Sequence, residues 1–148
     1  MDINFYNMNY DAFDMYQKSH YKRYELAATL VGKDDVVGDM ACGSGYGSLM
    51  LGKNCKEVCG FDIDKTTIEE INQRYSAETH ASFTEKNLLD ITEENKFDKI
   101  VSFETIEHFT PDEIKAIFES KKPGSIVNGE EIKQIIDFEL AMDPWVNF

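Results

Sequence analysis

The sequence predicts an α/β fold in which helices cover both faces of a mostly parallel sheet of about five strands. Short apolar runs alternate with segments of helical periodicity, a pattern typical of βαβ units. One of these runs, Val36–Ala41, leads directly into a glycine-rich turn. The chain has 148 residues, a length that favours a single domain over residues 1–148.

The first expected element is a helix over residues 16–31. Its apolar residues recur at three- and four-residue steps, at Tyr21, Tyr24, Ala28 and Val31, and they form one face of a helix. Gly32 is a natural stop. Because aromatic side chains are frequent from the start of the chain, residues 1–31 are expected either to form an N-terminal helical lid over a pocket or to pack on the core.

The middle of the chain alternates strands with helices. Strands are expected over 36–41, 57–63, 81–85 and 97–103, and helices are expected to begin at 48, 66 and 110. The fourth strand is apolar enough at its centre to be buried on both faces. Thr66 or Thr67 is expected to cap the helix over 66–76, and Pro111 suits the first turn of the helix after Thr110.

The end of the chain departs from this alternation. Residues 126–127 are expected to start a fifth strand, and residues 130–142 read as a periodic helix before an apolar tail. Residues 129–148 are therefore expected to form an atypical C-terminal helix and tail. The sheet edge would then be covered by this helix, by a second copy in a homo-oligomer or by a partner chain.

Composition narrows the classes of partner. The net charge of −13 repels phosphate backbones, so nucleic acid is not expected as a substrate. Three cysteines without a C-x-x-C pair favour neither a disulfide framework nor a zinc site. The N-terminus has no signal-peptide pattern and the chain has no membrane-spanning apolar run. We therefore expect a cytoplasmic protein.

A glycine turn and a carboxylate together indicate a ligand site. Gly43–Gly47 follow the first expected strand, and Asp62 ends the second, about 20 residues later. Open α/β sheets bind ligands outside the carboxyl ends of their strands, and glycines let the backbone approach a ligand closely. A carboxylate at this place accepts hydrogen bonds from ribose hydroxyls. The pair predicts an adenosine-containing ligand.

Charge favours one adenosine ligand over another. A dinucleotide turn of the form G-x-G-x-x-G that began at Gly43 would need glycine where Ser48 stands. Asp39 precedes the glycines, and an acidic group there repels a pyrophosphate but suits a cation. S-adenosylmethionine (SAM) carries an ammonium and a sulfonium and no phosphate. The electrostatics therefore favour SAM over NAD as the cofactor.

The sequence resembles class I SAM-dependent methyltransferases. Residues 37–47 are similar to their first motif, residues 58–64 to their second and residues 97–109 to their fourth-strand motif. His20-x2-Arg23-Tyr24-x2-Ala27 is similar to the N-terminal helix of the small-molecule and sugar branch of that family. The resemblance covers residues 16–125 and implies a Rossmann-like three-layer sandwich that lacks the C-terminal strands.

For the methionine half of SAM, the resemblance implies contacts from the turn. These residues are Asp39, Ala41, Gly43, Ser44 and Gly45. Phe103 would lie under the cofactor, and Arg23 would pair with the methionine carboxylate.

For the adenosine half, the resemblance assigns Asp62 to the ribose and Ile63 to packing on the adenine. Asn87 and Leu88, which follow the third strand, would meet the adenine edge. Asp64 is expected to start a helix rather than to act as a second ribose ligand.

A second constellation, Glu104-x2-Glu107-His108, follows the fourth strand. Three interpretations remain open: a divalent metal site, a general base or substrate-orienting group, and simple capping and packing of the loop. We assign His108 and Glu104 as catalytic candidates that take a proton from the methyl acceptor, and we assign no metal ligand.

The expected function is a SAM-dependent methyltransferase that acts on an oxygen or nitrogen of a small molecule. The alternative is a catalytically inactive SAM-binding module or regulatory subunit that needs a partner chain.

Overall fold

The computed structural model describes residues 3–91, 96–103, 105 and 108–118. In this part of the chain four parallel strands form one sheet, in the order β3-β2-β1-β4. The strands are β1 (Val36–Met40), β2 (Glu57–Asp62), β3 (Ala81–Glu85) and β4 (Lys99–Ser102). The helices are α1 (Met15–Leu30), α2 (Tyr46–Gly52), α3 (Lys65–Arg74) and α4 (Pro111–Phe118), with 3-10 helices η1 (Tyr10–Ala12) and η2 (Leu88–Asp90).

Parallel strands joined by crossovers confirm the predicted α/β, Rossmann-like fold. The expected fifth strand at 126–127, the helix over 130–142 and the apolar tail fall outside the described residues. None of the helices in the described part combines the length and the apolar character needed to cross a bilayer.

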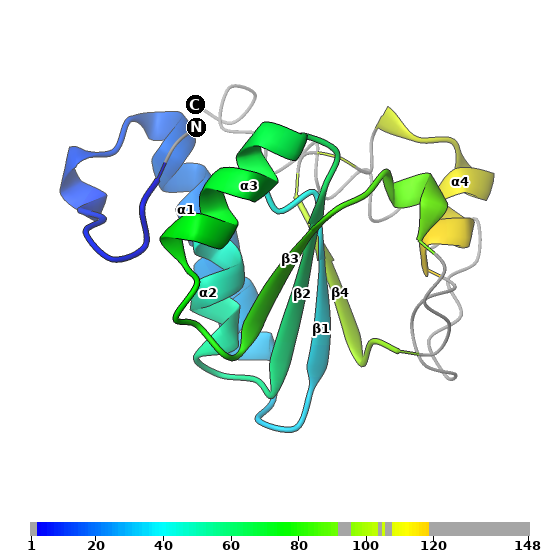
Figure 1. Ribbon diagram of the computed structural model, residues 1–148, viewed down its shortest axis with the longest axis horizontal. Helices are drawn as coiled ribbons and strands as arrows, with labels where there is room; N and C mark the ends of the chain where they lie inside the picture. Colours follow the sequence, from blue (N-terminus) through cyan, green and yellow to red (C-terminus); the bar gives the residue numbers. More distant parts are fainter. Residues whose placement is uncertain (1–2, 92–95, 104, 106–107, 119–148) are drawn as a thin grey trace.

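Helices cover both faces of the sheet. Figure 1 shows α1, α2 and α3 on one side of the strands and α4 on the other. Because side chains alternate along a strand, Val37 and Asp39 of β1 turn toward α1 and α2. Met40 instead packs in the same cluster as Ile117 of α4. The described residues therefore form three layers.

Two apolar clusters hold the helices to the first face. The buried members of one are Ile3, Tyr24, Ala27, Val37, Tyr46, Leu51, Cys55, Val58 and Val101, and those of the other are Cys42, Leu49, Ile68, Ile71, Tyr75 and Phe83. Burying one large apolar side chain contributes about 1.5–3 kcal/mol. These clusters fix α1, α2 and α3 over the strands whose carboxyl ends carry the predicted site.

The strand order reverses at β1. From β1 the chain adds β2 and then β3 on one side, and it returns to place β4 on the other side of β1. At such a reversal the connections leave in opposite directions, which opens a crevice at the carboxyl ends of the strands. The glycine turn after β1 therefore lies at the expected ligand position.

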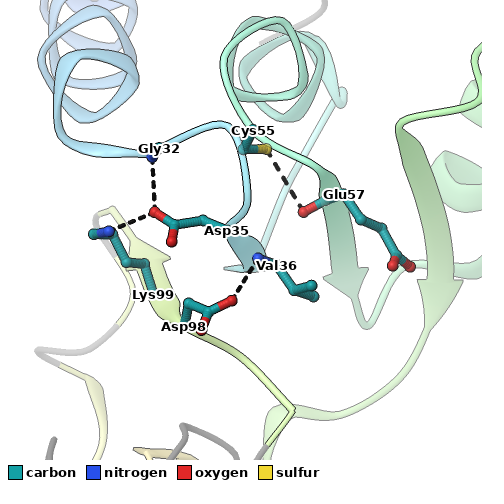
Figure 2. Close-up of polar contacts among 7 residues, drawn as sticks. All are labelled: Gly32, Asp35, Val36, Cys55, Glu57, Asp98 and Lys99. Carbon is teal, nitrogen blue, oxygen red and sulfur yellow. Dashed lines mark hydrogen bonds and ion pairs between the residues drawn. The ribbon is translucent and has the colours of Figure 1, made fainter.

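Side chains tie the amino ends of β1 and β4 together (Figure 2). Val36 N donates to Asp98 Oδ2 at 2.8 Å, and Asp98 N donates to Val36 O at 2.8 Å. Asp35 forms an ion pair with Lys99 and accepts a hydrogen bond from Gly32 N at 2.7 Å. The bond from Lys99 lowers the pKa of Asp35. These contacts fix the register between β1 and β4, whose carboxyl ends lead to the predicted site.

The start of α2 and the burial of β4 differ from the sequence-based prediction. Helix α2 begins at Tyr46 rather than Ser48, because Gly45 is its N-cap in a left-handed conformation. Within β4 only Val101 is fully buried, so the predicted burial on both faces is wrong for most of this strand. Among the described strands β4 pairs with β1 alone, and an outer strand keeps partial exposure.

Helix α3 begins at Lys65, and its cap is Asp64 rather than Thr66 or Thr67. The Asp64 carboxylate accepts a hydrogen bond from Thr67 N at 3.2 Å. A carboxylate also interacts favourably with the positive end of the helix dipole. The expectation that Asp64 starts the helix is therefore confirmed, and the expected threonine cap is wrong.

Gly47→Ala is expected to lower the free energy of unfolding by about 1–3 kcal/mol, the usual cost of overpacking. An added Cβ would lie 2.3–2.4 Å from ring atoms of the buried Tyr24. Gly52→Ala in the same helix is the matched control, because its Cβ would be 3.6 Å from the nearest atom, in His80. Urea unfolding followed by circular dichroism measures both, and equal effects would contradict the predicted clash.

Candidate functional site

The turn between β1 and α2 holds left-handed backbone conformations. The φ angle is 64° at Ala41, 56° at Gly43 and 83° at Gly45. A Cβ on Gly43 would have no heavy atom within 4 Å, so the backbone is open on that side. A non-glycine residue such as Ala41 in this region costs about 1–2 kcal/mol. Such conformations are concentrated where a backbone is shaped to receive a ligand.

The end of β2 meets this turn. Gly43 N donates to Asp62 Oδ2 at 3.0 Å, and Asp64 N donates to Asp62 Oδ1 at 3.0 Å. Cys42 N donates to Phe61 O at 2.8 Å, which fastens the turn to β2. Because each carboxylate oxygen has two acceptor sites, Asp62 can still accept hydrogen bonds from a ligand.

A pocket of about 330 Å³ opens beside the turn. Gly43, Ser44 and Asp62 line it from the sheet side, and Thr67 and Arg74 line it from α3. This volume is at the lower end of the range for small-molecule sites. Three of the predicted cofactor-binding residues therefore share the wall of one pocket.

Asp39 lies deeper, on the face of β1 that α1 and α2 cover. Its side chain is fully buried. Tyr24 Oη lies 3.0 Å from both carboxylate oxygens, and Ser48 Oγ donates to Oδ2 at 2.6 Å. Tyr24 is one of the apolar positions of the helix expected over residues 16–31, but that periodicity does not show that its hydroxyl reaches β1. Sequence reasoning missed both hydroxyl donors.

Burial decides the electrostatics of this group. Desolvation raises the pKa of Asp39 from its usual 3.8 to about 7, while the hydrogen bonds from Ser48 and Tyr24 oppose the rise and the nearby Asp62 adds to it. Burial also raises the pKa of Tyr24 well above its usual value. Tyr24 therefore stays protonated near neutral pH and acts as a donor to Asp39.

Phe103 packs on Tyr24, one of the two donors to Asp39, and Arg23 precedes Tyr24 in α1. The Phe103 ring, just after β4, meets the Tyr24 ring edge-on with 5.0 Å between centroids. Arg23 is buried beside Tyr24 in α1. The structure thus places Phe103 by way of Tyr24 on the same side of the sheet as Asp39. The roles of Phe103 and Arg23 toward a cofactor remain predictions.

The residues predicted to meet adenine divide into exposed and buried ones. Ile63, directly after Asp62, is 68% exposed, and its packing on adenine remains a prediction. Leu88 instead packs in the core with 7% exposure, whereas its neighbour Leu89 is 46% exposed. The Asn87 side chain accepts a hydrogen bond from Leu89 N at 3.0 Å. Sequence spacing did not indicate that the Leu88 side chain is buried, and the roles of Asn87 and Leu88 toward adenine remain predictions.

The second constellation is described only in part. His108 is exposed, and its backbone N donates to Thr105 O at 3.0 Å. Glu104 and Glu107 lie outside the described residues, so the predicted grouping of the three side chains stays a prediction. Among the residues that are described, no three histidine, cysteine or acidic side chains form a cluster suited to a metal ion.

One protein family matches the part of the chain that holds most of this site. Residues 37–122, more than half of the chain, match a family described as "Methyltransferase domain". The matched range begins in β1 and includes the glycine turn and Asp62. No curated protein sequence matches the chain.

Solved structures share the fold. The PH0226 protein from Pyrococcus horikoshii OT3 is 26% identical with a TM-score of 0.61, over 79% of this chain and 63% of that one. Phosphoethanolamine N-methyltransferase 1 of Haemonchus contortus, in complex with phosphoethanolamine and S-adenosylhomocysteine, is 14% identical with a TM-score of 0.61, over 76% of this chain and 28% of that one. A complex between the Haloferax volcanii Trm112 methyltransferase activator and a methyltransferase matches at 21% identity and a TM-score of 0.63, over 73% of this chain and 50% of that one. This chain spans less than two thirds of the length of each of these three chains.

Asp39→Asn is expected to gain stability relative to the native protein as pH rises from about 4 to about 7. In that window the folded protein keeps a proton on Asp39 that the unfolded chain has released, because the pKa is raised from 3.8 to about 7. Native stability therefore falls with rising pH through this group. Asparagine has no charge to desolvate, and it can accept from Tyr24 and donate to Ser48.

The difference in unfolding free energy between variant and native protein should grow in favour of the variant by up to about 4 kcal/mol across the window. Urea unfolding over a pH series measures it, and every other titrating group is common to both proteins. A difference that does not change with pH would contradict the raised pKa of Asp39.

Proposed function

This chain belongs to the methyltransferase domain family, and on that premise we propose that it binds SAM at the glycine turn and transfers the methyl group to an oxygen or nitrogen of a small molecule. One observation carries the proposal. The hydrogen bond of 3.0 Å from Gly43 N to Asp62 Oδ2 joins the turn of β1 to the carboxylate at the end of β2. A carboxylate beside an open stretch of backbone supports the assignment of Asp62 as the acceptor for the ribose hydroxyls.

The charges around the turn suit a cationic ligand. Asp62, Asp64 and Glu70 line the pocket against one guanidinium, that of Arg74. Asp39 adds a further acidic group beneath the turn. A pyrophosphate would meet repulsion from these carboxylates, whereas an ammonium and a sulfonium would be attracted. The residues present therefore fit SAM better than a dinucleotide.

The chain's own residues would bind and orient. When bound, SAM supplies an electrophilic methyl group on a sulfonium. Asp62 would accept hydrogen bonds from the ribose hydroxyls, and the exposed Ile63 would cover one face of the adenine. The backbone at Gly43 and Ser44 would lie against the ligand without a side chain at Gly43 in the way. Proximity and alignment then supply most of the acceleration.

His108 would take the proton from the acceptor. It follows β4, the strand beyond the point where strand order reverses, and its side chain is exposed. A histidine is charged or neutral near physiological pH according to its surroundings, which suits it to proton transfer. The proposal therefore places the acceptor between the cofactor and the segment after β4, with Glu104 as a second candidate base.

Asp62→Ala is expected to weaken SAM binding by about 100-fold or more, because two ribose hydroxyls lose a charged acceptor and each such bond is worth about 1.5–3 kcal/mol. Isothermal titration calorimetry with SAM, S-adenosylhomocysteine and NAD measures the affinities. The native chain should bind the first two and not NAD. Glu69→Ala is the control, because Glu69 is an exposed residue of α3 that does not line the pocket. Unchanged SAM binding by Asp62→Ala would remove the ribose assignment, and NAD binding in place of SAM would remove the cofactor assignment.

His108→Ala is expected to keep the affinity for SAM and to lower turnover by about 10²–10⁴-fold, the usual worth of a general base. Turnover is read as S-adenosylhomocysteine released with a panel of small amines, phenols and alcohols. An acceptor that the native chain methylates and that the variant methylates equally fast would exclude His108 as the base.

A binding role without transfer is the second candidate function. Among the described strands β4 pairs only with β1, and one matched structure is a methyltransferase complexed with an activator chain. A second chain along β4 would complete the acceptor side. SAM binding by the isolated chain with no S-adenosylhomocysteine released across the whole panel would favour this function over transfer.

A further inference from the structure

The proposed function leaves most of the helix α1 motif unused. His20, Arg23, Tyr24 and Ala27 lie on one side of α1 at three- and four-residue spacing. Arg23, Tyr24 and Ala27 are buried, and His20 Nδ1 lies 2.6 Å from Tyr46 Oη in α2. This face of α1 therefore packs against the first turn of α2, next to the glycine turn. Helix α1 therefore supports α2, the helix that follows the glycine turn.

Within this face Tyr24 is the residue that reaches the sheet. Its hydroxyl lies 3.0 Å from Asp39 Oδ1 and 3.0 Å from Asp39 Oδ2. Its ring is fixed by the edge of Phe103 and by the bare backbone of Gly47, where a Cβ would stand 2.3 Å from the ring. The hydroxyl has little freedom to point elsewhere, because the ring is 1% exposed.

A carboxylate with no access to water depends on such donors. Ionised Asp39 can only accept hydrogen bonds, and the described donors to its side chain are Tyr24 and Ser48. An ionised group buried without partners takes up a proton instead. The negative charge beneath the glycine turn thus depends on a hydroxyl supplied from α1.

We propose that Tyr24 is a positioning residue for cofactor binding, whose hydroxyl favours the ionised form of Asp39 beneath the glycine turn, so that α1 contributes to the affinity for a cationic methyl donor. This proposal rests on the proposed function. Tyr24 has no part in the chemistry of transfer. It acts through Asp39, which supplies the attraction for the cation.

The groups that face Asp39 determine how the effect varies with pH. Tyr24 from α1 and Ser48 from α2 favour the ionised form, whereas Asp62 at the end of β2 opposes it. The Cys42 thiol, whose pKa burial and these carboxylates raise, stays neutral. The β4 residue paired with Asp39 is Val101, which does not titrate. SAM binding should therefore tighten as pH rises through the pKa of Asp39, about 7.

The test compares two tyrosine variants of the full chain. Tyr24→Phe keeps the ring and removes the hydroxyl that reaches Asp39. Tyr21→Phe is the matched control, because Tyr21 lies in the same helix and the same aromatic cluster, stacked on Tyr46. SAM affinity is measured by calorimetry from about pH 6 to about pH 9, the range that brackets a carboxyl titrating near neutrality.

The expected loss for Tyr24→Phe is about tenfold in affinity near pH 7, the low end for a hydrogen bond to a charged group. The loss should shrink toward the highest pH, because Asp39 is then ionised in both proteins, and the midpoint of the pH dependence should move upward. Tyr21→Phe should match the native protein throughout. A loss of packing alone would weaken binding equally at every pH.

A double-mutant cycle supplies the second measurement. In the Asp39→Asn background no charge remains to be held, so Tyr24→Phe should leave the affinity for SAM unchanged. If circular dichroism shows that the single Tyr24→Phe variant does not fold, the effect of Tyr24→Phe is measured in the Asp39→Asn background alone. Failure of native protein to bind SAM would overturn the proposed function itself. Native binding with no effect of Tyr24→Phe, an effect independent of pH, or a further loss in the Asp39→Asn background would overturn the role of Tyr24 alone.

Discussion

A carboxylate shut off from water lies where three elements of this domain converge, and their packing is arranged around it. Asp39 comes from β1, Tyr24 from α1 and Ser48 from α2. A charge buried without partners costs several kcal/mol, so the helices cannot move away from β1 without leaving an unpaired group. The same contact fixes the start of α2, and with it the glycine turn. A polar constraint in the core thereby determines the shape of the site.

The two ends of the sheet serve different purposes. At the amino ends, Val36 and Asp98 exchange backbone and side-chain hydrogen bonds, and Asp35 pairs with Lys99 (Figure 2). These contacts join residues far apart in the sequence, and they fix how β1 and β4 enter the sheet. At the carboxyl ends, the turn after β1 has left-handed and open backbone, and hydrogen bonds from Cys42 N and Gly43 N fasten it to the end of β2. Rigid pairing at one end allows the irregular backbone at the other to keep a defined geometry.

Much of this arrangement could be predicted from the sequence, for reasons that individual residues make clear. The strand before the glycines and the carboxylate of Asp62 follow from apolar periodicity and from where parallel strands end. The contact between Tyr24 and Asp39 could not be predicted, because periodicity shows which face of a helix is buried but not which polar atom it meets. Leu88 and Leu89 show the same limit. Both lie in the short 3-10 helix η2, and the sequence does not show that Leu88 faces the core and Leu89 the surface.

The charge state of Asp39 explains why a buried carboxylate suits a site for a cation. A group that stayed ionised at every pH would impose the full desolvation cost on the fold, and a group that stayed neutral would attract nothing. With a pKa of about 7, the two forms differ little in free energy at neutral pH. A cation nearby then needs only a small interaction energy to favour the ionised form. Two hydroxyl donors, Tyr24 on α1 and Ser48 on α2, keep the two forms of Asp39 close in free energy. A cationic ligand that favours ionised Asp39 therefore also stabilises the packing of α1 and α2 against β1.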